Sequence, residues 1–346
     1  MVGTCRHPTG EATVRPLDRS FDVTEEIGTG EPLSQTAWIF APEDAAEVKG
    51  AILCLAGGTY DKRYWHPEVP GHDGYSFGRH LAGRGYVVIA LDHLGVGGSS
   101  DPTASGAVTL QLMARGDAAV AAQIRARLDG GTLVPGLPPL PHLPLIGAGH
   151  SMGACLTTMV QAQAGAYDAV VLLGYGVDIT NVHDEKATSE ALEERVDETE
   201  AIFRATTGTA PDATSTIVPR ALLRQLFHGP DVPEEVIRVD DAAQSRVPVR
   251  AASEVTTPGY VRQYAEAVDV PIFLGFGRVD VSPDPYAEPA CYRASADVTL
   301  VIVEGSGHCH NFAGRRGELW NRIASWGDAI SSRRTAAASS LEGDVR

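Results

Sequence analysis

The sequence predicts an α/β protein built on a mostly parallel sheet of eight strands that is flanked by helices. Short continuous apolar runs recur along the chain, and such runs are typical of strands buried on both faces of a parallel sheet. They alternate with segments of helical spacing, which is the rhythm of consecutive βαβ units. The alternation breaks between residues 178 and 268, which predicts a helical insertion there.

Eight segments are expected as strands. The first two, which the Gly28-Thr29-Gly30 turn joins, are expected at the edge of the sheet, and the others are apolar runs. The expected strands cover residues 21–27, 36–41, 50–56, 86–91, 143–148, 169–174, 270–276 and 298–303. The expected helices cover residues 75–84, 110–128 and 152–164, and a closing helix carries Leu319, Ile323, Trp326 and Ile330 on one face.

The chain divides into a core, one insertion and two ends. Residues 20–177 and 269–332 are expected to form the core, residues 1–19 a flexible N-terminus and residues 333–346 a flexible tail. Within residues 178–268, the segment 187–206 is expected as an acidic helix with apolar residues on one side. We expect this insertion to act as a lid, because ligands of open α/β sheets bind over the strand ends that such inserts cover. A peripheral subdomain with no role at the site is the alternative.

Composition narrows the choice of partners and compartment. The formal charge of −16 disfavours nucleic acid and anionic membrane surfaces, which attract Lys and Arg. The five cysteines are odd in number and not closely paired, so reduced thiols are expected. The N-terminus lacks the apolar region of a secretory signal, and no apolar run is long enough to cross a bilayer. A cytoplasmic protein without membrane association is therefore expected.

The stretch Gly149-His150-Ser151-Met152-Gly153 matches the pattern G-x-S-x-G between an apolar run and a small-residue helix. A serine hydroxyl is a weak nucleophile that must stand clear of the chain beside a base, and a sharp strand-to-helix turn presents it in this way. The helix that follows offers free N–H groups, and the Met152 N–H is expected as half of an oxyanion hole. An ordinary loop is the alternative, because the chain is rich in glycine.

Partners for this serine follow the last two expected strands. Asp280 comes just after the strand 270–276, and His308 comes just after the strand 298–303, so both belong to the same sheet edge as Ser151. A nucleophilic serine needs a base, and the base needs an acid to orient it. The three residues occur in the chain in the order Ser151, Asp280, His308.

Other residues compete for these roles. Asp178 and Asp284 are alternative acids, and His310 is an alternative base. The stretch His308-Cys309-His310 is similar to a pair of metal ligands, but no third ligand lies nearby with zinc spacing, so no metal is expected.

Taken together, the motifs resemble those of the α/β-hydrolase fold from about residue 21 to residue 331. They are 55-LAGGT-59, 92-DHLGVGGS-99, the elbow around Ser151, 277-GRVD-280 and 305-GSGH-308. The resemblance implies that Ser151 is the nucleophile, His308 the general base and acid, and Asp280 the orienting carboxylate. It also implies that backbone N–H groups of Met152 and of Gly58 or Thr59 form the oxyanion hole.

One position departs from the family pattern, and several aromatic residues lie near the expected site. Many relatives carry histidine where Ala56 stands, which leaves the side-chain bracing of the oxyanion turn open. Candidate pocket residues are Tyr60 and Trp65, which follow this turn, and His150, which precedes the nucleophile. Packing of the loop and of the elbow is the alternative role for these three side chains.

The expected function is a serine hydrolase that cleaves a carboxylic ester, thioester or lactone of small to medium size through an acyl-enzyme. No cofactor is expected, the expected partner is the small-molecule substrate, and the oligomeric state stays open between monomer and homodimer. An acyltransferase or thioesterase of a biosynthetic pathway is one alternative. A small-ligand receptor that does not hydrolyse is another, because one fold hosts many functions.

Overall fold

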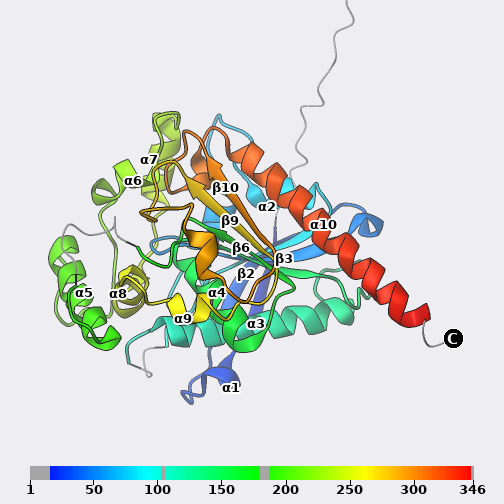
Figure 1. Ribbon diagram of the computed structural model, residues 1–346, viewed down its shortest axis with the longest axis horizontal. Coiled ribbons are helices and arrows are strands. Elements are labelled where there is room, and N and C mark those ends of the chain that lie inside the picture. Colours follow the sequence, from blue (N-terminus) through cyan, green and yellow to red (C-terminus); the bar gives the residue numbers. More distant parts are fainter. Residues whose placement is uncertain (1–15, 103–105, 180–186, 344–346) are drawn as a thin grey trace, which may run out of the picture.

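A computed structural model describes residues 16–102, 106–179 and 187–343. Its centre is an eight-stranded, mostly parallel sheet with the order β1-β2-β4-β3-β5-β6-β9-β10, as the sequence predicts (Figure 1). The strands are β1 (Leu17–Asp22), β2 (Ser34–Phe40), β3 (Gly50–Leu55), β4 (Tyr86–Leu91), β5 (Leu145–His150), β6 (Ala169–Leu173), β9 (Ile272–Gly277) and β10 (Val298–Val303).

The strand β2 pairs antiparallel with both β1 and β4, and every other pair in the sheet is parallel. Each residue of the central strands β3, β4, β5, β6 and β9 is buried, which explains their continuous apolar runs. The edge strand β10 is half-buried over most of its length. The carboxyl ends of β5, β9 and β10 therefore meet at one edge of the sheet.

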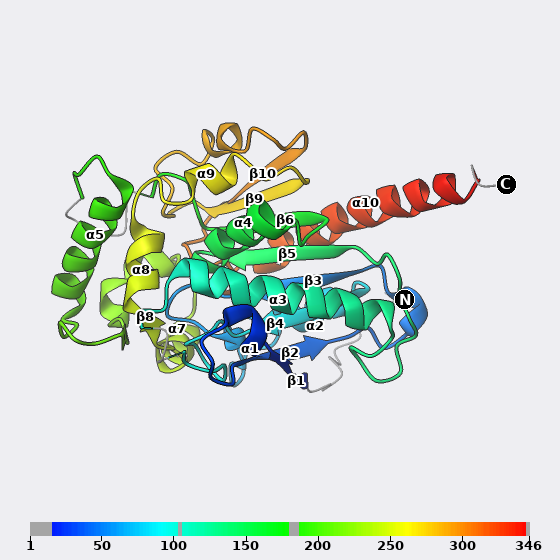
Figure 2. The same ribbon diagram turned by 90° about the horizontal axis from the view of Figure 1, so that it is seen from below.

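Helices cover both faces of the sheet, and each face has its own apolar core (Figure 2). Side chains of α3 (Leu110–Asp129) and α4 (Met152–Ala164) belong to one core, and those of α2 (Phe77–Ala82) and α10 (Arg316–Gly343) belong to the other. The short helix α1 (Thr24–Ile27) packs beside α3. Single 3-10 turns occur at Ala45–Glu47, Lys62–Trp65, Arg220–Leu222, Glu288–Cys291 and His310–Phe312.

Residues 178–268, which we call the insert, join β6 to β9. In both views its helices α5 and α8 lie at the end of the molecule opposite the C-terminus of α10 (Figures 1 and 2). The elements of the insert are α5 (Leu192–Thr207), β7 (Ser215–Thr216), α6 (Arg224–Phe227), α7 (Glu234–Ala242), β8 (Val247–Pro248), α8 (Val249–Thr256) and α9 (Arg262–Ala265). Arg250 of α8 binds Asp197 and Glu200 of α5, which ties these two helices together.

The structure corrects several expected boundaries. The helix expected at 187–206 begins at Leu192, after irregular chain at 187–190. Of the expected tail at 333–346, the residues up to Gly343 belong to the helix α10, and the alanines among them favour a helix. The strand β1 begins at Leu17, inside the expected flexible N-terminus, because Leu17–Asp22 pairs residue by residue with β2.

Residues 1–15, 103–105, 180–186 and 344–346 lie outside the described residues, and most of the expected flexible N-terminus is among them. The four cysteines that the structure describes, Cys54, Cys155, Cys291 and Cys309, are free thiols, and Cys5 lies outside. No described helix is both long enough and apolar enough to span a membrane.

Candidate active site

Ser151 lies at the corner between β5 and α4, with φ 54° and ψ −119°. A positive φ is uncommon for a residue with a side chain, and it turns the serine away from the strand. The glycines on either side are needed sterically, because a Cβ at Gly149 would collide with the backbone of Gly153, and one at Gly153 with that of Leu55. The corner is closed by a hydrogen bond from Ser151 N to Leu173 O, at 2.8 Å.

Asp280 and His308 form a close polar contact near this corner. The Nδ1 atom of His308 lies 2.7 Å from Oδ1 of Asp280, and both side chains are buried. Two backbone N–H groups also donate to the carboxylate, from Gly277 to Oδ2 at 2.7 Å and from Val281 to Oδ1 at 2.8 Å. Burial alone would raise the pKa of Asp280, but its charge interactions and hydrogen bonds with His308 and His310 outweigh burial and lower it. The carboxylate is thus held ionised.

The two alternative acids lie elsewhere. Asp178 forms an exposed ion pair with Arg262 on α9. Asp284 is exposed and accepts a hydrogen bond from the Tyr286 backbone N–H at 3.1 Å.

His310, the alternative base, contacts the other oxygen of the same acid. Its Nε2 atom lies 3.1 Å from Oδ2 of Asp280, and its side chain is fully buried. The cavity that contains Ser151 is lined by His308, whereas His310 is not among its lining residues. Asp280 therefore accepts hydrogen bonds from two imidazoles, of which His308 is the one that reaches the cavity.

His150 is packed rather than exposed to this cavity. Its ring stacks on that of Tyr64, at 4.5 Å between centroids, and its Nε2–H donates to His308 O at 2.9 Å. Burial, followed by the neighbouring His308 and His310, holds the pKa of His150 well below its usual value. A neutral imidazole therefore fixes the main chain at His308.

The turn after β3 borders the same cavity. Gly58, Thr59 and Met152 line it together with Ser151, which brings the expected oxyanion donors to the serine. His93 stabilises this turn, because its Nε2–H donates a hydrogen bond to Ala56 O at 3.0 Å. The Nδ1 atom of His93 lies 3.0 Å from Asp117 Oδ2. Burial lowers the pKa of His93, but Asp117 outweighs burial, and the net shift is upward.

Ala56 has no side chain that could support the turn, unlike the histidine that many relatives carry at this position. A histidine at the end of β4 and a carboxylate on α3 hold the backbone carbonyl of Ala56 instead.

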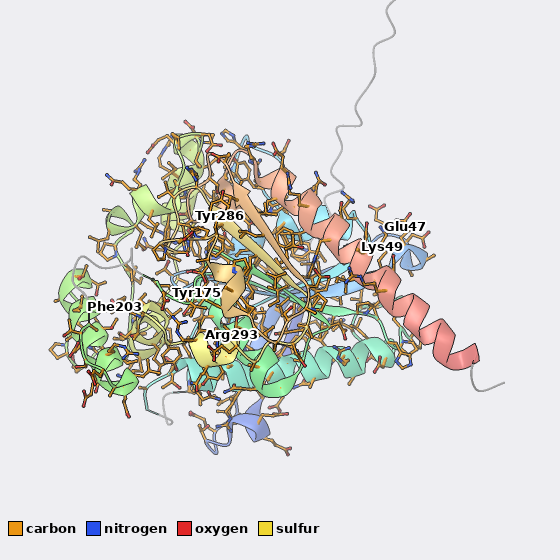
Figure 3. The ribbon with its side chains drawn as sticks, viewed as in Figure 1. Glu47, Lys49, Tyr175, Phe203, Tyr286 and Arg293 are labelled. Carbon is orange, nitrogen blue, oxygen red and sulfur yellow. The ribbon has the colours of Figure 1, made fainter. Side chains whose placement is uncertain are left out.

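The cavity beside Ser151 has a volume of about 950 Å³, and no Asp, Glu, Lys or Arg is present among the described residues that line it. Most of its wall comes from the insert, and Tyr175 and Val281 contribute from the core. Figure 3 labels Tyr175, which follows β6, and Phe203, which belongs to α5. The apolar lining residues from the insert are Ile179, Ile202, Phe203, Ala205, Val218, Leu222, Leu223, Leu226, Phe227, Val247, Ala252 and Val255.

Tyr60, Trp65 and His150, the expected pocket residues, are not among the residues that border the cavity beside Ser151. Trp65 is fully buried and packs on Phe77, at 4.9 Å between ring centroids. Tyr60 is buried with its hydroxyl 3.0 Å from Asp240 of the insert. The aromatic side chains after the turn therefore pack the loop.

Sequence reasoning missed the residues that the insert supplies. Arg220 reaches Thr59, and Asp240 binds Tyr60, although both lie far from these partners in the chain. Neither belongs to a motif, so only the three-dimensional arrangement identifies them. Among the described residues, no group of three His, Cys, Asp or Glu side chains is arranged to hold a metal ion.

An open α/β sheet with a serine at a strand-to-helix corner and a His–Asp pair at the same edge is typical of the α/β-hydrolase fold. The family model of the alpha/beta hydrolase family matches residues 52–318, so the chain belongs to this family. Among curated protein sequences, none matches the chain significantly.

Solved structures share the fold at low sequence identity. A soluble variant of monoglyceride lipase from Saccharomyces cerevisiae matches with a TM-score of 0.61 and 15% identity over 94% of this chain and 99% of that chain. A thermophilic esterase from Thermogutta terrifontis matches with a TM-score of 0.56 and 14% identity over 87% and 95%. E-2-(Acetamidomethylene)succinate hydrolase matches with a TM-score of 0.53 and 19% identity over 89% and 98%. Membership of the family supports a hydrolase, and these neighbours show the same fold.

Proposed function

We propose that the protein is a serine hydrolase that cleaves carboxylic esters through an acyl-enzyme. The observation that carries this proposal is the 2.7 Å contact between Asp280 and His308, with His308 and Ser151 bordering one cavity. A nucleophile, a base oriented by a buried acid, and backbone donors together form the apparatus that acyl transfer requires. Family membership supports the same reaction class.

In the proposed reaction, Ser151 Oγ attacks the carbonyl carbon while His308 Nε2 takes the hydroxyl proton. The tetrahedral oxyanion is stabilised by the Met152 N–H and by an N–H of Gly58 or Thr59. His308 then gives the proton to the leaving alcohol, and an acyl group remains on Ser151. Water repeats the sequence and releases the acid. Asp280 keeps the Nδ1 proton on His308 and stabilises the imidazolium.

The lining of the cavity supports a neutral substrate with an apolar acyl part. An ionised substrate group would lose its hydration without gaining a charged partner, which is costly. The volume of about 950 Å³ falls in the range of small-molecule sites and leaves room for a medium-length acyl chain. A carboxylic ester, thioester or lactone satisfies these conditions.

We further propose that the insert acts as the lid of this site. This proposal is supported by its lining residues, which come from α5, α6 and α8 as well as from the loops between them. The side chains that bound the acyl part therefore belong to the insert, whereas the reacting groups belong to the core.

Hydrolysis of p-nitrophenyl esters from acetate to laurate tests the function. We expect turnover by the wild type, best at medium chain length, and a loss of several orders of magnitude in Ser151→Ala at unchanged thermal stability. Wild-type protein that binds these esters without releasing p-nitrophenol would indicate a receptor instead. A higher rate with an added alcohol or amine acceptor than with water would indicate an acyltransferase.

A further inference from the structure

Thr59 holds an unusual backbone conformation in the turn that follows β3. Its φ is +71°, and the turn is closed by a hydrogen bond from Tyr60 N to Gly57 O at 3.2 Å. A β-branched residue rarely adopts the left-handed region, where glycine is preferred. Such a conformation persists only where surrounding contacts enforce it.

Two residues of the insert provide these contacts. Arg220 donates from Nη1 to Thr59 Oγ1 at 2.5 Å and from Nη2 to Thr59 O at 3.3 Å. The backbone N–H of Ser245 donates to the same carbonyl at 2.7 Å. The insert thus binds both the side chain and the main chain of Thr59, although Arg220 lies 161 residues further along the chain.

Arg220 is itself fixed in place. It is only 6% exposed, and its guanidinium lies over the rings of Tyr60 and Phe227, at 4.3 and 5.3 Å from their centroids. Its Nε atom lies 3.8 Å from Oδ2 of Asp240, a carboxylate that also accepts the Tyr60 hydroxyl at 3.0 Å. Burying the Arg220 charge costs folding free energy unless the guanidinium is paired. This cost points to a role of Arg220 beyond stability.

We propose that Arg220 is a positioning residue that aligns the oxyanion turn by holding Thr59 in its positive-φ conformation. This inference rests on the proposed function, in which an N–H of Gly58 or Thr59 faces the developing oxyanion. Arg220 is not among the residues that border the cavity, so it acts through Thr59 and not on the substrate. The insert therefore completes the oxyanion hole of the core in addition to bounding the acyl pocket.

The alternative is that Arg220 only fastens the insert to the core. In either role, replacing Arg220 would lower stability, so a stability measurement does not distinguish the two roles. A comparison of two inhibitors, of which only one forms an oxyanion, does distinguish them. A trifluoromethyl ketone forms a hemiketal oxyanion on Ser151, whereas the corresponding secondary alcohol occupies the same pocket without one. The ratio of the two inhibition constants removes the contribution of binding in the pocket and reports hemiketal formation, which the oxyanion hole stabilises.

The experiment uses Arg220→Met, which keeps the apolar stem, together with Thr59→Val and Thr59→Ser. Arg250→Met is the matched control, because Arg250 bridges helices within the insert through Asp197 and Glu200. Rates are normalised to the concentration of sites that a fluorophosphonate titrates.

We expect Arg220→Met to lower kcat about 100-fold with KM changed less than about threefold, since loss of one oxyanion donor costs about 10²–10³-fold. The inhibitor ratio should fall by a similar factor. Thr59→Val, which lacks the hydroxyl acceptor, should lower kcat about tenfold, and Thr59→Ser should restore most of it. Arg250→Met should lower the melting temperature and leave the inhibitor ratio unchanged.

An inhibitor ratio in Arg220→Met equal to that of the wild type would overturn the proposal. If Arg220→Met does not fold, Thr59→Val decides, and wild-type kcat in that variant overturns it equally. Hydrogen exchange of the Gly58 and Thr59 amides adds a readout that needs no turnover. We expect faster exchange at these amides in Arg220→Met or Thr59→Val than in Arg250→Met. Absence of ester turnover in the wild type would reject the proposed function, and the exchange result would still show whether Arg220 holds the turn.

Discussion

Asp280 and His310 are joined by a buried contact of 3.1 Å between Oδ2 and Nε2, on the oxygen opposite to the one that binds His308. The Nδ1 atom of His310 has no hydrogen-bond partner among the described residues, and its ring donates from Nε2 to Asp280. One carboxylate therefore shares its negative charge between two N–H donors. This sharing weakens its hold on the proton of His308.

Replacing His310 should shift the pH dependence of the enzyme. In His310→Leu the carboxylate loses one donor, so the imidazolium form of His308 is stabilised and the acid limb of the kcat/KM profile should move to higher pH. We expect a shift of about one pH unit, equivalent to about 1.4 kcal/mol. His310→Gln can still donate from its amide and should stay close to the wild-type profile. Identical profiles for the Leu and Gln variants would refute this role.

The acid itself is tested by two substitutions measured on one ester at one pH. Asp280→Asn should lose about 10⁴-fold in kcat, because a neutral amide favours the wrong tautomer of the base. Asp178→Asn should lose at most about tenfold, a change of about 1.4 kcal/mol in the barrier. Asp178 pairs with Arg262 at the surface, so its loss removes no contact to His308. The reverse ranking would move the acid to Asp178.

Glu254 of α8 should make stability fall as the pH rises. Its Oε2 accepts a hydrogen bond from the Leu110 N–H at the start of α3, and burial raises its pKa from 4.5 to about 7. The folded state therefore favours the protonated form. The stabilisation is fully present below about pH 4.5 and is lost as the pH rises through about 7, by up to about 3 kcal/mol.

Urea unfolding of the wild type and of Glu254→Gln checks this expectation. The variant stays neutral, and its amide oxygen can still accept from the Leu110 N–H. The difference in unfolding free energy, wild type minus variant, should decrease between pH 4.5 and pH 7.5 and then stay level. A constant difference over this range would contradict a raised pKa at Glu254.

Phe203 should limit the length of the acyl chain. It lies on α5 of the insert and lines the cavity beside Ser151 (Figure 3). Phe203→Ala enlarges the pocket, so kcat/KM should rise for laurate relative to butyrate by about tenfold, and turnover of acetate should change less than about twofold. The magnitude corresponds to about 1.4 kcal/mol, within the range for methylene discrimination. An unchanged chain-length profile would remove the insert from substrate selection.

The sheet could be predicted from the sequence because its strands are continuous apolar runs. The edge elements were harder, since β1 begins at Leu17 in a polar stretch and its place depends on pairing with β2 and on burial of Phe21 in the core. The hydrophobic pattern also fails to give the end of the last helix, because the expected core ended at residue 332 and α10 continues to Gly343. Residues that show no hydrophobic periodicity in the sequence can still extend a helix that has already started.

The candidate site divides in the same way. Ser151, Asp280 and His308 could be proposed from the sequence because each follows a strand, and strand ends of one sheet edge converge. Arg220 carries no such signal, because its place depends on how the insert folds back over Thr59. The lining of the cavity beside Ser151 carries no such signal either, since most of it comes from the insert and none from the aromatic residues that follow the turn in sequence.

Mass spectrometry of the protein after treatment with a fluorophosphonate tests the assignment of Ser151 most directly. The wild type should gain one adduct, located on the peptide that contains Ser151, and Asp280→Asn should gain it far more slowly. Ser151→Ala should gain none under the same conditions. Hydrolysis of an ester by wild-type protein whose adduct lies on another residue, with Ser151 unmodified, would contradict the proposed mechanism.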